Sequence, residues 1–132
     1  MGLDLYFNRV KRKIQHLKSF RKVNFLVKFF ENQGLFDYEN PVPITVDKKL
    51  AEELLDRCEK VLRDHSKAKE LLPTMEGFFF GSTEYDDYYF DDVKEVRDFL
   101  KSKLLPEYDK LEELKIEGDV SYEDCIQFYA WF

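Results

Sequence analysis

Residues 77–92, GFFFGSTEYDDYYFDD, set three phenylalanines between two glycines, then a Ser-Thr pair, then acids among tyrosines. GFFFG is too apolar for a surface loop and glycines commonly mark turns, so we predict a short buried strand over residues 77–81. A hydroxyl side chain can accept a hydrogen bond from a free backbone N–H at a helix start. We therefore expect Ser82 or Thr83 to cap a helix running from about residue 85 to residue 104.

The rest of the chain adds two strands and two helices. Residues 3–10 (LDLYFNRV) alternate apolar and polar side chains, as a half-buried strand does. Residues 122–131 end in a stretch that is apolar on both sides, as expected for a strand paired inside the sheet. Apolar residues at helical spacing predict helices over residues 19–34 and about 47–65. We therefore predict an α+β fold in a single domain over residues 1–132. Its three main helices pack on a small antiparallel sheet formed by residues 3–10, 77–81 and 122–131.

Phenylalanines on both sides of the predicted 19–34 helix leave two interpretations open. Phe20 and Phe30 share one face, whereas Phe25 and Phe29 fall on the opposite side, among lysines and arginines. A helix that is apolar on two sides is usually central to a core. Aromatic residues interleaved with basic ones can instead stack on bases. A nucleic-acid or phosphate-binding module that uses the basic region 9–28 is therefore kept as an alternative function.

The charge of the chain is distributed unevenly. The net charge is −6, but residues 1–30 hold eight Lys or Arg against one Asp, which leaves −13 for the remainder. Such a split can mark an electrostatic partner site. It can equally mean that the two regions lie against each other and partly neutralise.

A stripe of acids is expected on the outer side of the helix that follows GFFFG. Asp87, Asp91, Glu95 and Asp98 are spaced by four, four and three residues, so they project together, with Tyr88 beside them as an aromatic anchor. We predict these five residues as a partner-binding surface.

The sequence supplies no motif for a membrane segment or a secretion signal. No apolar run approaches the roughly 18 residues that span a bilayer, and the start MGLDLYFNRVKRK lacks the basic-then-apolar order of a signal peptide. We expect a cytoplasmic protein without membrane contact. Cys58 and Cys125 have no CxxC spacing, and buried thiols are expected in preference to a disulfide.

Searches for catalytic and cofactor motifs assign no residue. GFFFGST resembles a phosphate loop only in its glycines, because Ser82 stands where the lysine is needed. His16 and His65 have no metal-ligand spacing, and His65 lies in line with an apolar stripe, as a packed or edge residue does. The acids of residues 84–92 lack the order of a calcium loop. We predict no metal, no cofactor and no catalytic residue. A small hydrolase or metal-dependent enzyme around GFFFGSTEYD is kept as a further alternative.

Three segments resemble a family of small uncharacterised proteins from bacteriophages and bacterial genomes. They are MGLDLYF at the start, SFRKVNFLVKFF at 19–30, and LLPTMEGFFFGSTEYDDYYFDD at 71–92. In that family the chain begins MGLDMYL, and a WRKAN-type helix and an LLPTxxGFFFGSTEYDxYY block follow. Here Leu5, Phe20 and Val23 stand in place of Met, Trp and Ala, which keeps the positions hydrophobic. The resemblance implies a phage or prophage setting and carries no activity.

Together these features favour a non-enzymatic accessory protein that binds a host protein through the acidic, tyrosine-bearing helix face. A stripe of carboxylates can occupy a basic groove built for phosphates. A nucleic-acid-binding defence component of the host, inhibited by this protein, is therefore a candidate partner.

Overall fold

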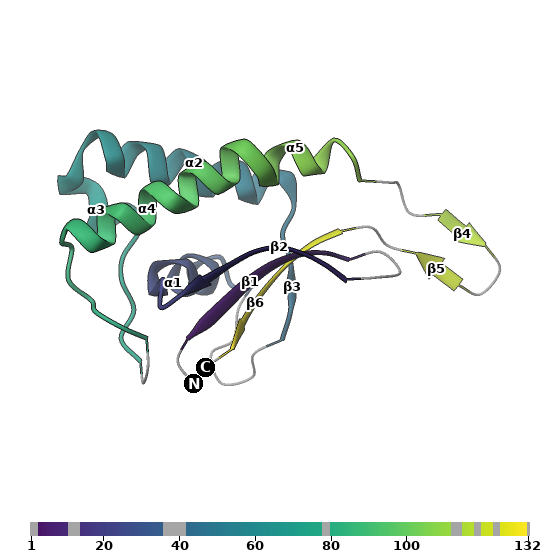
Figure 1. The fold of residues 1–132 in the computed structure, drawn as a ribbon, viewed down its shortest axis with the longest axis horizontal. Coiled ribbons are helices and arrows are strands. Elements are labelled where there is room, and N and C mark those ends of the chain that lie inside the picture. The colour runs from purple at the N-terminus through teal and green to yellow at the C-terminus, as the bar shows by residue number, and fades with distance from the viewer. Residues whose placement is uncertain are drawn as a thin grey trace.

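The computed structural model describes residues 3–10, 14–35, 42–77, 80–111, 115–117, 120–122 and 125–131. The described part has the predicted α+β architecture, with a four-stranded antiparallel sheet in the order β2-β1-β6-β3 and a layer of helices over it (Figure 1). Its strands are β1 (Asp4–Val10), β2 (Ile14–Arg21), β3 (Ile44–Thr45) and β6 (Cys125–Trp131). A separate two-stranded sheet joins β4 (Lys115–Glu117) to β5 (Val120–Tyr122).

The strands predicted within residues 3–10 and 122–131 are confirmed, and they pair with each other. β1 and β6 are antiparallel neighbours, with Leu5 opposite Ala130. Leu5 and Phe7 are buried while Tyr6 and Asn8 are partly exposed, so one face of the sheet meets the helices. The alternation of apolar and polar residues in β1 therefore predicts correctly which side chains face the helices.

The prediction that residues 77–81 form the third strand is wrong for the residues that the structure describes there. Gly77, Phe80 and Gly81 lie in no strand, and the Phe80 N–H donates to the Gly77 carbonyl at 3.1 Å, which makes a turn. A Cβ on Gly77 would lie 2.8 Å from the Phe80 ring, so the turn folds this buried ring against a residue without a side chain. Phe78 and Phe79 lie outside the described residues.

The other strand beside β1 is β2, which includes residues 19–21 of the helix predicted over residues 19–34. β2 pairs with β1 in antiparallel register, with Phe20 opposite Leu5. The helix predicted over residues 19–34 therefore begins later, as α1 (Asn24–Asn32). The spacing of Phe20 and its neighbours is compatible with a helix or a strand. The strand forms because pairing with β1 stabilises it.

The remaining helices agree with the predicted positions. α2 spans Lys48–Arg63, and the Asp47 side chain caps it by accepting from the Leu50 N–H at 2.7 Å. A 3₁₀ turn (His65–Lys67) and α3 (Ala68–Leu71) follow. α4 (Asp87–Phe99) continues through a π-helical segment (Leu100–Leu104) into α5 (Leu105–Tyr108). The cap of α4 is Asp86, rather than the predicted Ser82 or Thr83, and it accepts from the Tyr89 N–H at 3.1 Å.

The core between sheet and helices is built largely from phenylalanines. Phe30 of α1 stacks on Phe128 of β6 with ring centroids 4.3 Å apart, and Phe7 meets Phe99 of α4 edge-on at 5.3 Å. Phe25 and Phe29 are also buried. α1 is therefore a central helix, and its phenylalanines are not placed to stack on bases.

Two further sequence predictions can be compared with the described residues. Cys58 and Cys125 are buried free thiols, as expected. Across the described ranges, no helix is both long and apolar enough to pass through a membrane.

Candidate functional site

The five residues predicted as a partner surface all lie on the exposed side of α4. The helix packs inward through Tyr89, Val93, Val96 and Phe99, which are buried. Asp87, Tyr88, Asp91, Glu95 and Asp98 are exposed on the other side. Tyr88 is the most exposed of the large hydrophobic side chains described, at 81%. The helical spacing thus places these residues as predicted.

The acids of this surface are not equally available. Glu95 forms an ion pair with Lys18 of β2 at 3.0 Å, and Asp98 pairs with its neighbour Arg97 at 2.9 Å. Asp87 and Asp91 form no ion pair with any residue in the described ranges. Uncompensated negative charge is therefore concentrated in the first half of α4, around Tyr88.

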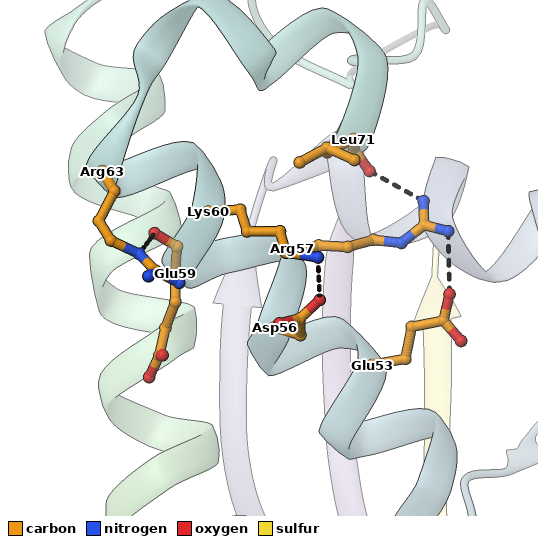
Figure 2. Close-up of polar contacts among 7 residues, drawn as sticks. All are labelled: Glu53, Asp56, Arg57, Glu59, Lys60, Arg63 and Leu71. Carbon is orange, nitrogen blue, oxygen red and sulfur yellow. Dashed lines mark hydrogen bonds and ion pairs between the residues drawn. The ribbon is translucent and has the colours of Figure 1, made fainter.

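The neighbouring helix α2 shows the opposite arrangement of charges. Figure 2 shows Arg57 paired with Glu53 at 2.9 Å and Lys60 paired with Asp56 at 2.8 Å, each four residues apart. Arg57 also donates to the Leu71 carbonyl at 3.0 Å, which ties α2 to α3. These acids are neutralised within their own helix, as is usual on a solvated helical face. The first half of α4 lacks such compensation.

A cleft of about 180 Å³ lies beside this end of α4. Three parts of the chain line it: residues 21–25 at the start of α1, the loop residues 81, 82 and 84 together with Thr74, and residues of the segment 86–92. Residues 21–25 are far from residues 81–92 along the chain, so no local sequence pattern predicts that they meet in this cleft. The family resemblance could have suggested this contact, because two of the three segments that carry it, residues 19–30 and 71–92, meet at the cleft.

One wall of the cleft is fixed by the side chain of Asn24. Its Nδ2 donates to the carbonyls of Phe80 and Ser82, both at 3.0 Å, and its Oδ1 accepts from the Met75 N–H at 3.1 Å. The side chain is buried, so each lost bond would leave a desolvated polar group. Asn24 thereby holds the loop around GFFFGST against α1.

Two residues with left-handed backbone conformations meet at the cleft. Lys22 has a φ of 58°, which is uncommon for a residue with a side chain, and Gly81 has a φ of 88°. A Cβ on Gly81 would lie 3.1 Å from the Lys22 Cβ. This close approach and the positive φ both favour glycine at position 81.

Asp92 is a partly buried carboxyl group that lines the cleft. Burial raises its pKa to about 6, and the nearby charges of Glu95, Asp91 and Asp86 act in the same direction. The ionised form is therefore poorly solvated and would gain from a positively charged group in the cleft.

Other groups considered for chemistry are placed unfavourably for it. Burial raises the pKa of Cys58 to about 12, so its thiolate is scarce at neutral pH. The exposed His65 stacks on Phe90 with ring centroids 3.7 Å apart. The described residues hold no group of three His, Cys, Asp or Glu side chains suited to a metal ion.

Comparison with protein-family models, curated proteins and solved structures finds no match to this chain.

Proposed function

We propose that the chain is a non-enzymatic binding protein that uses the outer side of α4 to bind a basic surface of another protein. The contact centres on Asp87, Tyr88 and Asp91, with Glu95 and Asp98 at its edge. On the resemblance described above, we further propose a bacteriophage or prophage origin and a bacterial host protein as partner. A host nuclease or another nucleic-acid-binding defence component presents the basic groove that such a surface fits.

The observation that carries this proposal is the exposure of Tyr88 between two acids without ion pairs. Tyr88 is 81% exposed, so packing in the core does not explain why an aromatic residue stands at this position. Tyrosines are enriched among residues that dominate interface energies. Carboxylates around an aromatic anchor speed encounter with a basic partner and set the orientation of docking.

The nucleic-acid alternative, based on residues 9–28, has less support. Arg9 pairs with Glu107 at 3.0 Å, Lys18 with Glu95 at 3.0 Å, and Lys28 with Glu31 at 3.3 Å. These cations are therefore partly neutralised. For the enzyme alternative around GFFFGSTEYD, the supporting observation among the described residues is the raised pKa of Asp92, which lies six residues after that block.

The test compares two double variants with the same change of net charge. Asp87→Lys with Asp91→Lys reverses the charge of the proposed surface. Glu52→Lys with Glu70→Lys reverses two exposed acids on α2 and α3. Each purified variant and the parent are used to retain proteins from a host lysate, and retained proteins are then tested individually by calorimetry.

We expect a retained basic protein to bind the parent and the control but not the α4 variant. Its binding should weaken as salt rises, and Tyr88→Ala should weaken it by about 2 kcal/mol. Equal binding by the parent and the α4 variant contradicts the proposal. Salt-sensitive binding of the parent to DNA or RNA favours the alternative instead.

A further inference from the structure

The cleft beside α4 is lined by charges of both signs. Arg21, the last residue of β2, and Lys22 after it supply the positive charges, and Glu84, Asp86 and Asp92 in the loop and α4 supply the negative ones. None of the ion pairs among the described residues joins Lys22 to these carboxylates. Opposite charges around a space of about 180 Å³ suit a ligand that carries both charges itself.

We propose that this cleft binds a free α-amino acid in its zwitterionic form. The carboxylate of the ligand lies beside Lys22, and its ammonium group lies beside Asp86 and Asp92. An anion alone would meet the three carboxylates, and a cation alone would meet Arg21 and Lys22. A zwitterion gains a charge-assisted hydrogen bond at each end.

The walls of the cleft are positioned before any ligand arrives. The Lys22 N–H donates to the Leu3 carbonyl at 2.8 Å, which holds the residue in its left-handed conformation. Gly81 packs against the Lys22 side chain, and Asn24 bonds the loop carbonyls behind it. An uncommon backbone conformation held by its surroundings is a feature that clusters at binding sites.

The size of the cleft and the state of Asp92 agree with this ligand. Sites for drug-sized molecules measure about 300–1,000 Å³, so the smaller cleft here favours a small molecule. Burial and neighbouring acids raise the pKa of Asp92, and an ammonium group beside it would relieve both effects. The cleft shares Tyr88 with the proposed partner surface, but the charged residues assigned to the ligand, Lys22, Asp86 and Asp92, are not part of that surface, so the two proposals can be tested separately.

The test is isothermal titration calorimetry of the purified chain with each common L-amino acid in turn, at millimolar concentration. For each amino acid that binds, the N-acetyl derivative lacks the ammonium group and the carboxamide derivative lacks the carboxylate. Asp92→Asn and Lys22→Asn each remove one charge, and asparagine tolerates the left-handed backbone at position 22. Glu52→Gln and Lys49→Asn are matched controls on α2.

At least one amino acid should bind the parent and both controls. Each blocked derivative and each cleft variant should bind about tenfold more weakly or worse, as expected for the loss of one charge-assisted hydrogen bond. Circular dichroism checks that the variants are folded, and Asp92→Asn, which removes an unfavourable charge, should fold at least as well as the parent. Absence of binding for every amino acid overturns the proposal. Equal binding of the blocked derivatives, or of Asp92→Asn, also overturns it.

Discussion

Lys18 of β2 and Glu95 of α4 form an ion pair that connects the basic start of the chain to its acidic helix, with 3.0 Å between Nζ and Oε1. Arg9 and Glu107 make a second such connection, also at 3.0 Å. The uneven charge distribution of the sequence is therefore partly internal, because oppositely charged segments lie against each other. Asp87 and Asp91 form no ion pair with the other described residues, so this internal pairing does not account for their charge.

The Lys18–Glu95 pair should contribute little to stability. Both side chains are substantially exposed, at 37% and 52%. We expect Glu95→Gln to lower the free energy of unfolding by less than about 1 kcal/mol. A double-mutant cycle with Lys18→Gln, followed by urea unfolding at low and high salt, measures the coupling. A coupling that is large and insensitive to salt would contradict a solvent-screened pair.

Phe80→Ala should strongly destabilise the fold. The Phe80 side chain is only 1% exposed, so its removal leaves a cavity, and we expect a loss of about 3–5 kcal/mol. Tyr88→Ala removes an aromatic ring of similar size that is 81% exposed, and it should change stability by less than about 0.5 kcal/mol. Thermal melts of the two variants give the comparison, and equal midpoints would count against the described burial of Phe80.

Asn24→Ala should cost about 3 kcal/mol or more, because it leaves two carbonyls and one N–H without their partner. Asn32→Ala, at an exposed position near the end of the same helix, is the control and should be nearly neutral. Urea unfolding measures both. Hydrogen exchange should in addition show faster exchange of the Met75 amide in Asn24→Ala, and unchanged protection there would argue against the described network.

Asp92 should make the stability of the protein depend on pH. Because its folded pKa, about 6, lies above its ordinary value of 3.8, the folded state holds the proton more tightly than the unfolded state does. The contribution of Asp92 to stability therefore falls as pH rises between these two values and stays low above them.

Asp92→Asn should remove this dependence. We expect it to raise the free energy of unfolding at neutral pH by on the order of 1 kcal/mol, since partial exposure of the carboxyl screens the effect. Below pH 3.8 the variant and the parent should be nearly equal. Urea titrations across the acidic range measure the difference, and a gain that persists in acid would point to a cause other than ionisation.

Local patterns predicted well those elements whose side chains have one clear period. The alternation of residues 3–10 and the stripe from Tyr89 to Leu104 are reproduced as a strand and a helical segment. Residues 14–21 were missed, because the run IQHLKSFR has no clean alternation and becomes a strand only by pairing with β1. Phe80 was wrongly assigned to a strand because its apolar character indicates burial, and a turn whose carbonyl is held by Asn24 buries it as well as a strand does.

The candidate sites divide in the same way. The exposed α4 surface follows from helical spacing within one element, so the sequence predicts it. The cleft requires Lys22 and Asn24 to meet residues 81–92, and this contact depends on how β2 turns into α1 at the left-handed Lys22. No local pattern encodes that meeting.

The pairing of β1 with β6 has a consequence for how the chain is made. Asp4 lies opposite Trp131, so the central pair of the sheet cannot form until the ribosome has released residues 125–131. Until then β1 and β2 can form only a hairpin, and such an isolated pair is marginally stable in water. Because synthesis proceeds at about 5–20 residues per second, the apolar residues of β1 and α1 remain for seconds in the nascent chain without their final packing partners. Synthesis in the cell should therefore be the stage at which this protein depends most on chaperones.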